Sequence, residues 1–417
     1  MKLISTTGRG SKKRIAELIA RRSATYERAM PAAWRIVKSV HHGGDAALRR
    51  YATRFDRISP HVQLRISNEE MNAAWEAAPV DLKHALKLAA KNIRAFAKRQ
   101  HPHEWDFAPT RGVTVGQRIR PICNVGCYVP SGRYPLPSTL LMTVIPAQVA
   151  GVERIVVASP RPAKETLAAA AMLGVTEFYR MGGAQAIAAL AYGTESIPRV
   201  DKIVGPGNAF VTAAKKLVAF DCAIDMLAGP TEIVVTSEDG NPAWIAADLI
   251  AQAEHDPDAL AIFVTSTTSL ARAVVAEVKK RVRSNPIAAE AIARRGLALV
   301  TENVEEAREI TNQLAPEHLT VDREADQAWV KNAGSVFVGR YSSQPLGDYV
   351  SGPNHTLPTS GLAQVRGGLS VLDFVKIVTV QEYKPEGLRR LGPAATALAE
   401  AEGLRGHAEA IRVRGIE

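Results

Sequence analysis

Four histidines in the C-terminal part of the chain each lie in a short polar cluster, and they are His255, His318, His355 and His407. The other six histidines all precede residue 104. Each of the four has a carboxylate or carboxamide nearby in sequence. These partners are Gln252, Glu317, Asp348 and Glu402. An imidazole beside an oxygen ligand is typical of a zinc site or of an acid–base pair. The pattern therefore indicates an enzyme.

Two of these pairs can be placed on local structure. Gln252 and His255 are three residues apart in a helical stretch that ends before Pro257, so both side chains can reach one ion from the same face. The alternative is a histidine favoured by the dipole at a helix C-terminus. Glu317 and His318 are adjacent, and a turn is needed for both to face one pocket. They suit acid–base chemistry, although a surface loop explains the dipeptide as well.

Several glycine- and proline-rich loops could hold a ligand. The loop G-D-Y-V-S-G-P-N-H-T-L-P-T contains Asp348 and His355, and such a loop after a strand is where α/β proteins place ligands. V-G-P-G-N-A-F could receive a phosphate, or it could be a turn capped by Asn208. M-G-G-A-Q-A-I places Gln185 near a helix start, and the loop that begins G-C-Y-V-P carries Tyr128, which could stack on a ring.

The elements that must position these residues follow from periodicity. Residues from about 11 to 101 are predicted mostly helical. From about 150, short β-branched strands alternate with helices, which predicts parallel sheets covered on both faces. The predicted strands are residues 154–159, 177–181, 202–204, 232–237, 260–265, 297–301 and 335–339. They divide near residues 228–231 into two α/β units, and the tail after about 375 is predicted helical without strands.

Size and composition are those of a globular protein of two domains. The chain has 417 residues, of which 46% are hydrophobic and 23% charged. No stretch approaches the roughly 18–20 apolar residues of a membrane helix. Three cysteines, Cys123, Cys127 and Cys222, are too few for a disulfide framework. We therefore expect buried thiols and a reducing cytoplasm.

The net charge of +10 invites a nucleic-acid hypothesis, but its location argues against one. Residues 1–60 carry 14 Lys and Arg against 4 Asp and Glu, and the remaining residues balance. We expect the excess to form a basic N-terminal arm rather than a charged face of the folded body. Its helical pattern has Ile15, Leu18 and Ile19 on one side and predicts a solvated basic face. A secretory signal's apolar core is absent.

Taken together, these segments resemble the histidinol dehydrogenase family. The most specific match is residues 204–232, which run from V-G-P-G-N-A-F to A-G-P-T-E and include Thr231 where the family has Ser or Thr. Q-A-E-H-D-P, A-P-E-H-L, the loop with His355 and the late E-G-L-x-x-H occur in the family's order. The resemblance runs over essentially the whole chain.

The resemblance implies a function and a set of site residues. The expected activity is the oxidation of L-histidinol to L-histidine through the aldehyde, with two NAD reduced. The implied zinc ligands are Gln252, His255, Asp348 and His407, the last from the other subunit of a homodimer. Glu317 and His318 become the acid–base pair. The implied substrate-binding residues are Thr231, His355 and Glu402 together with the zinc ligands and the acid–base pair, and the implied NAD contacts are Tyr128, Gln185 and Asn208.

The implied fold has two incomplete Rossmann-like domains. We expect residues 21–120 with 232–370 to form one domain that carries the zinc and catalytic residues, and residues 121–231 to form the other, on the NAD side. Residues 1–20 are the expected basic helical arm, and residues 371–417 the helical tail that reaches the partner subunit.

Two other functions are compatible with some of these residues. A relative could oxidise a different alcohol, although His355, Glu402 and His407 are all present. A zinc hydrolase could use Glu beside His to activate water, and it would need no nicotinamide.

Overall fold

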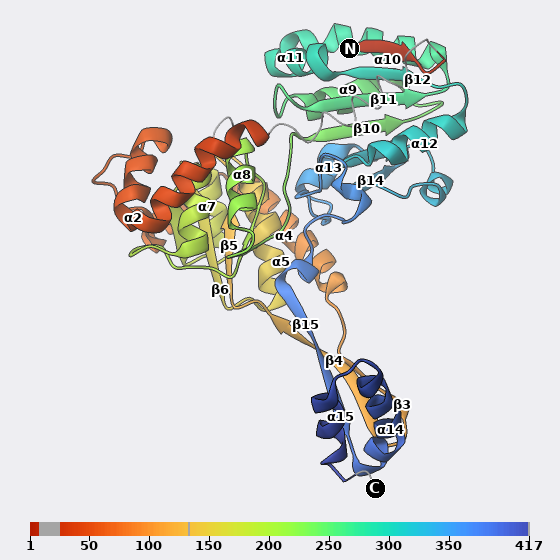
Figure 1. The fold of residues 1–417 in the computed structure, drawn as a ribbon. Helices are drawn as coiled ribbons and strands as arrows, with labels where there is room; N and C mark the ends of the chain where they lie inside the picture. Colours follow the sequence, from red (N-terminus) through yellow and green to blue (C-terminus); the bar gives the residue numbers. More distant parts are fainter. Residues whose placement is uncertain (8–25, 132–133, 416–417) are drawn as a thin grey trace.

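The computed structural model describes residues 1–7, 26–131 and 134–415. Two six-stranded sheets and one three-stranded antiparallel sheet make up its β-structure. Figure 1 shows two α/β units side by side, with a smaller C-terminal part that projects away from both. The predicted fold of two α/β units is confirmed, and the chain passes from one sheet to the other between residues 224 and 232, where the sequence predicts the division.

The first α/β unit is built on a sheet that we call the N-terminal sheet. Its order is β2-β7-β6-β5-β8-β9, parallel except for β2. The strands are β2 (Arg65–Ile66), β5 (Asn124–Tyr128), β6 (Arg154–Ser159), β7 (Glu177–Arg180), β8 (Lys202–Val204) and β9 (Ala223–Ile224). One face is covered by α2 (Met30–Asp56), α7 (Gly183–Tyr192) and α8 (Ala209–Val218). The other face is covered by α3 (Asn68–Ala77), α4 (Val80–Gln100), α5 (Pro137–Ala150) and α6 (Lys164–Met172).

The second unit is built on the C-terminal sheet, whose order β1-β12-β11-β10-β13-β14 is parallel throughout. The strands are β1 (Lys2–Ser5), β10 (Glu232–Thr236), β11 (Leu260–Thr265), β12 (Leu297–Val300), β13 (His318–Val321) and β14 (Ser335–Val338). On one face lie α9 (Pro242–Ala253), α10 (Thr268–Arg281) and α11 (Pro286–Arg295), and on the other α12 (Val304–Leu314). The short α13 (Gln344–Tyr349) follows β14.

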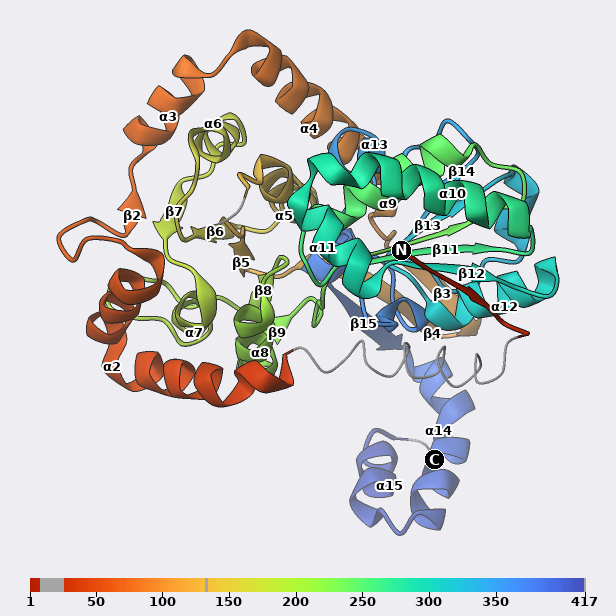
Figure 2. The same ribbon diagram turned by 90° about the horizontal axis from the view of Figure 1, so that it is seen from above.

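The projecting C-terminal part contains the small sheet, in the order β15-β4-β3. Its strands are β3 (Trp105–Thr110), β4 (Val113–Pro121) and β15 (Val375–Tyr383), and they are followed by α14 (Pro385–Ala401) and α15 (Arg405–Arg412). In Figure 2, as in Figure 1, both helices stand away from the two α/β units. The expectation of a tail without strands is wrong, because β15 pairs along its whole length with β4.

The domain boundaries differ from those expected. Residues 30–100 do not join residues 232–370; α2, α3 and α4 pack on the N-terminal sheet. Residues 2–5 are not part of an arm but form β1, paired with β12. Amphipathic periodicity shows that a helix buries one face, but it does not say against which sheet. The predicted helix around Ile15, Leu18 and Ile19 lies outside the described residues.

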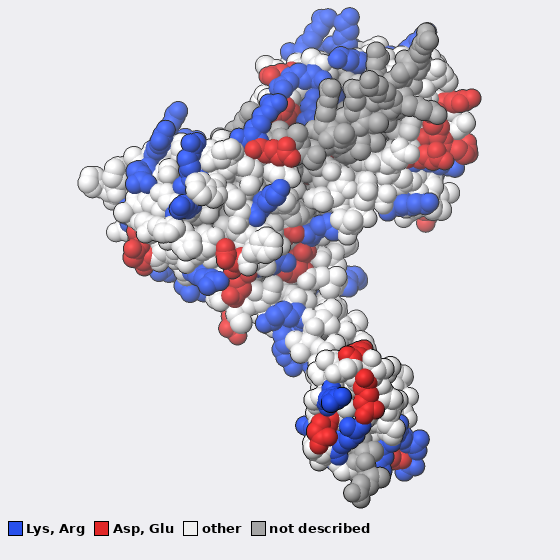
Figure 3. Space-filling model, viewed as in Figure 1, with Lys and Arg blue, Asp and Glu red and all other residues white. Residues whose placement is uncertain are grey.

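Part of the basic excess belongs to the folded body rather than to an arm. Arg35, Lys38 and Arg49 lie on α2, which packs on the N-terminal sheet. On the face drawn in Figure 3, basic and acidic side chains are interspersed over the projecting C-terminal part. Among the thiols, Cys127 and Cys222 are buried as expected, but Cys123 is exposed. No helix within the described ranges is long and apolar enough to cross a membrane.

Candidate active site

A cavity of about 550 Å³ lies where the carboxyl ends of N-terminal-sheet strands meet the amino ends of C-terminal-sheet strands. From the first sheet it receives the turn after β8. From the second it receives the residue before β10, the start of β13 and the end of α9. The predicted site residues that line it are Asn208, Thr231, Gln252, His255, Glu317, His318, Asp348 and His355. The fold thus brings together residues that are up to 147 positions apart in the chain.

His318 is the first residue of β13 and is buried. Its Nδ1 lies 3.2 Å from the carbonyl oxygen of Glu232, which can only accept, so Nδ1 carries the proton. Its Nε2 accepts from the Gln344 amide at 3.4 Å and lies 3.4 Å from Asp348 Oδ1. Although burial opposes it, the carboxylates of Glu317 and Asp348 hold the pKa of His318 above its usual value. Nε2 is therefore the nitrogen that is set up to take a proton.

Glu317 is also buried, and its carboxylate is fixed from two sides. Oε2 accepts from the Thr231 hydroxyl at 2.6 Å and from the backbone N–H of Glu232 at 2.8 Å. Burial raises the pKa of Glu317 to about 7. A carboxylate with a pKa near neutrality is suited to general-base chemistry. The turn that the sequence requires is present, since both Glu317 and His318 line the cavity.

The Gln252 amide leaves one buried atom without a partner. Nε2 donates to the Thr231 hydroxyl, which in turn donates to Glu317. Oε1 is buried and has no hydrogen bond among the described residues. A buried carbonyl oxygen without a donor is costly, unless a cation or a substrate group satisfies it. His255 lies three residues later, just beyond the end of α9, and lines the same cavity.

Asp348 lies on α13 opposite these groups. Interactions with His318, His355 and His255 outweigh burial and lower its pKa, so the carboxylate is charged. His355 Nδ1 donates to the carbonyl oxygen of Asp348 at 2.8 Å, and His355 Nε2 lies 3.3 Å from the Thr139 hydroxyl. Burial lowers the pKa of His355, which keeps its ring neutral. No group of three or more His, Cys, Asp or Glu side chains in the described part of one chain is arranged to hold a metal ion.

Gln344 is a site residue that the sequence reasoning missed. It is buried, and its amide donates to both His318 Nε2 and Asp348. Gln344 precedes Asp348 by four residues, which puts both on one face of α13. That spacing is the signal that could have found it.

The three predicted NAD contacts fall into two groups. Asn208 lines the cavity and caps α8, where its Oδ1 accepts from the N–H groups of Phe210 and Val211 at 3.0 and 3.1 Å. Tyr128 and Gln185 are buried outside the cavity lining. The Tyr128 hydroxyl accepts from Gly183 N at 3.2 Å, and Gln185 donates to Asp56 at 3.0 Å. Tyr128 is the last residue of β5, and Gln185 and Asn208 follow the carboxyl ends of β7 and β8.

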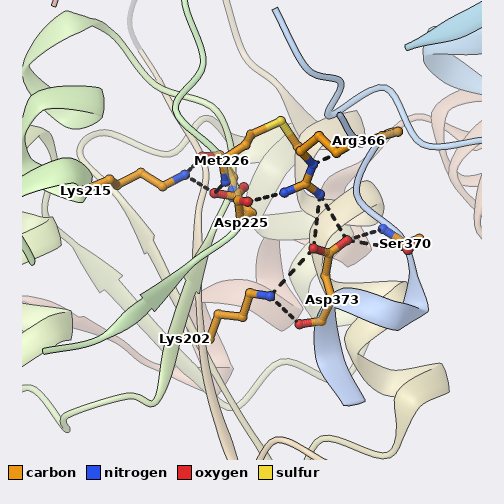
Figure 4. A network of polar contacts seen from close by, with 9 residues as sticks. Lys202, Lys215, Asp225, Met226, Arg366, Ser370 and Asp373 are labelled. Atoms are coloured by element: carbon orange, nitrogen blue, oxygen red, sulfur yellow. Dashed lines mark hydrogen bonds and ion pairs between the residues drawn. The ribbon is translucent and has the colours of Figure 1, made fainter. Parts of the chain in front are cut away.

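A buried ionic network supports the turn that carries Asn208 (Figure 4). Asp225 accepts from Gly205 N at 2.8 Å and pairs with Lys215, whose Nζ also donates to Gly205 O at 2.9 Å. Gly205 has φ +115°, and a Cβ there would collide with the backbone of Tyr128. Arg366 donates to the carbonyl of Asp225 and to Asp373, so the segment after the His355 loop is tied to the same turn.

Glu402 and His407 lie apart from this cavity in the single chain. Glu402 ends α14 and His407 lies on α15, both exposed in the projecting C-terminal part. Neither lines the cavity.

Comparison with known proteins identifies the scaffold. A family model described as histidinol dehydrogenase matches residues 19–415. The chain belongs to the histidinol dehydrogenase family. The histidinol dehydrogenase of Geobacillus kaustophilus is 48% identical over 392 residues, covering 91% of this chain and 92% of that protein. The one from Methanothermobacter thermautotrophicus is 45% identical over 419 residues, covering 96% of this chain and 97% of that protein.

A solved structure agrees with the sequence matches. Histidinol dehydrogenase from Elizabethkingia anophelis superposes with a TM-score of 0.92 at 34% identity, covering 99% of this chain and 98% of that one. The resemblance drawn from the motifs is thus confirmed, and the chain is an oxidoreductase.

Proposed function

We propose that this protein oxidises L-histidinol to L-histidine through L-histidinaldehyde, with zinc bound and two NAD reduced, as the last step of histidine biosynthesis in the cytoplasm. The observation that carries the proposal is the cavity itself. A buried acid–base pair, Glu317 and His318, lies there beside a carboxamide, an imidazole and a carboxylate. The cavity opens against the carboxyl edge of the N-terminal sheet, where α/β proteins bind nucleotides.

Zinc fits the donor set of Gln252, His255 and Asp348. The buried Gln252 Oε1 has no other partner within the described residues, and Asp348 is a charged oxygen donor. One chain thus offers three donors, and we assign the fourth to His407 of the partner subunit. When bound, zinc would hold the substrate's imidazole and amine and so orient the carbinol carbon.

His318 takes the hydroxyl proton in the first oxidation. In the neutral form of the ring, Nδ1 holds a proton against Glu232 O, so the hydroxyl proton moves to Nε2. The imidazolium that forms lies 3.4 Å from Asp348 Oδ1, which stabilises its charge. NAD supplies the acceptor for the hydride in each oxidation.

Glu317 acts in the second oxidation, in which the aldehyde must first add water. Its carboxylate, positioned by Thr231 and Glu232 N, takes a proton from the attacking water. The resulting hydrate carries the hydrogen that leaves as the second hydride. Burial of the site retains the reactive aldehyde between the two steps.

The remaining site residues recognise the ligands. We assign Thr231, His355 and Glu402 of the partner subunit to histidinol, and Tyr128, Gln185 and Asn208 to NAD. Asn208 lines the cavity, which supports its assignment, whereas Tyr128 and Gln185 are buried outside the cavity lining. The assignment of Glu402 and His407 to a homodimer is supported by their exposure far from their own chain's cavity.

The stoichiometry of NADH decides this proposal. Purified, zinc-loaded protein is given limiting L-histidinol and excess NAD, and NADH absorbance is compared with the histidine formed. We expect two NADH for each histidine. One NADH per turnover with aldehyde released contradicts the two-step reaction. Hydrolytic activity without any NAD dependence supports a zinc hydrolase instead.

A further inference from the structure

A second cavity, of about 760 Å³, lies at the opposite end of the C-terminal sheet from the active site. Its lining comes from the carboxyl ends of β10, β13 and β14 and from the N-terminal end of α9. The active-site cavity takes residues from the amino ends of β10 and β13 and from the end of α9. The same strands thus contribute to two separate cavities, and none of the residues assigned to histidinol, zinc or NAD lines the second.

The topology predicts a ligand at this position. In the sheet, β11 and β13 are the two neighbours of β10. The chain runs from β10 to β11 through α9 on one face of the sheet, and it enters β13 from α12 on the opposite face. The carboxyl ends of β10 and β13 therefore form the switch point at which open α/β sheets bind ligands. The N-terminal sheet has the same arrangement at β5 and β8, and there the active-site cavity lies.

The side chains at the mouth of the cavity suit a flat aromatic ring. Trp244 on α9 is 44% exposed, and Tyr341, after β14, is 76% exposed. Their ring centroids are 5.8 Å apart at an angle of 43°. Exposed aromatic faces around a concave site are the usual platform for a base or another planar heterocycle.

The wall behind these rings is polar and acidic. Asp248 and Asp322 are partly buried there. Asp248 accepts from Ser343 Oγ and Asp322 accepts from Glu238 N, each at 2.8 Å. Asp239 is paired with Arg323, so it does not add to the negative charge. Thr320 Oγ1 is buried and has no hydrogen bond within the described residues. Arg340 also lines the cavity, and its guanidinium lies over the Tyr341 ring, 5.4 Å from the ring centroid. Carboxylates accept from hydroxyl groups, so the wall formed by Asp248 and Asp322 favours a sugar.

We propose that this cavity binds a nucleoside, with its base against Trp244 and Tyr341 and its ribose hydroxyls on Asp248 and Asp322. This site goes beyond the proposed dehydrogenase activity and does not depend on it. Trp244 and Gln252 lie on the same helix, eight residues or about 12 Å apart along its axis, so the two ligands would not overlap.

The test is a calorimetric titration of the zinc-loaded protein with adenosine. The titration is run with and without saturating NAD, which keeps an adenine ring out of the dinucleotide site but can itself offer an adenosine to the second cavity. We expect one saturable adenosine site per subunit. Trp244→Ala and Tyr341→Ala should each weaken adenosine binding on the order of tenfold, and Trp244→Phe should retain most of it.

Two controls separate this site from the active site. Asn208→Ala should leave adenosine binding unchanged, and Trp244→Ala should leave the histidinol-dependent NADH rate unchanged, which also shows that the variant is folded. Absence of saturable adenosine binding both with and without NAD overturns the proposal. So does adenosine binding that survives Trp244→Ala and Tyr341→Ala together, or binding without NAD that Asn208→Ala abolishes.

Discussion

At the scale of single residues, the proposed division of the proton transfers between His318 and Glu317 follows from the different partners of the two side chains. The Nδ1 position of His318 is occupied by a carbonyl, so only Nε2 exchanges a proton with substrate. We expect His318→Ala to lower turnover about 10²–10⁴-fold, since it removes the general base. Zinc content should stay near that of the unaltered protein. Steady-state NADH rates and metal analysis of the same preparation check this, and a large loss of zinc would assign His318 to the metal instead.

Thr231 is the residue that links Gln252 to Glu317. Thr231→Val keeps the shape of the side chain but removes the hydroxyl that donates to the carboxylate. Hydrogen bonds to charged groups contribute about 1.5–3 kcal/mol, so we expect kcat/KM for histidinol to fall about 10- to 100-fold. Thr231→Ser retains the hydroxyl and should stay within a few-fold of the unaltered protein. Equal losses in the Val and Ser variants would show that the methyl group, not the hydrogen bond, matters.

Residue types and spacing predicted many of the site residues, but not all of them. Seven residues singled out by type and spacing line one cavity, and Thr231, which only the resemblance singled out, lines it too. Gln344 was missed because its contact with His318 depends on where β13 meets α13, which the spacing between Gln344 and Asp348 does not show by itself. Glu402 and His407 could be assigned only through the resemblance, since no spacing within one chain shows what another chain supplies.

At the scale of elements, the helices and strands were easier to predict than the strands they pair with and the sheets they pack against. The β-branched runs predicted β6, β7, β8, β10, β11, β12 and β14, because a fully buried strand is a continuous apolar segment. The exposed strand β15 was missed although its sequence V-K-I-V-T-V-Q-E-Y is rich in β-branched residues, because it lies outside the strand–helix alternation and its pairing with β4 spans more than 250 residues of sequence. The helices α2, α3 and α4 were assigned to the wrong sheet, because an amphipathic pattern shows that a helix buries one face but not against which sheet.

The end of α2 meets the start of α7 through Asp56, which accepts from Gly182 N and Gln185 at 3.0 Å each. Burial raises the pKa of Asp56, although these hydrogen bonds oppose the shift. The folded state then holds the proton more tightly than the unfolded chain does. The free energy of unfolding therefore falls as pH rises from about 4 through the raised pKa, and is constant above it.

Asp56→Asn keeps an acceptor for both donors but cannot ionise. We expect the stability of Asp56→Asn relative to the unaltered protein to increase with pH over that window, as measured by urea unfolding at several pH values. Asp56→Ala leaves buried donors unpaired and should lose about 1–3 kcal/mol at every pH. A stability difference for Asp56→Asn that does not change with pH would mean that Asp56 titrates alike in the folded and unfolded states.

At the scale of the whole molecule, the projecting C-terminal part is the feature on which the proposed homodimer depends. The small sheet carries α14 and α15 away from the body, and with them Glu402 and His407. A closed two-fold dimer places the same part of each subunit against the other. In such a dimer each active site combines Gln252, His255 and Asp348 of one chain with the two C-terminal residues of its partner.

This arrangement predicts complementation between two inactive variants. His407→Ala should lose zinc, and His318→Ala should keep zinc but lose turnover. In a mixed dimer, one site combines the intact His318 of the first variant with the intact His407 of the second, while the other site carries both defects. Random exchange of equal amounts makes half of the dimers mixed, so activity should return to about a quarter of that of the unaltered protein. Subunit exchange is verified with differently tagged chains, and mixed dimers that form but stay inactive would show that each chain builds its site alone.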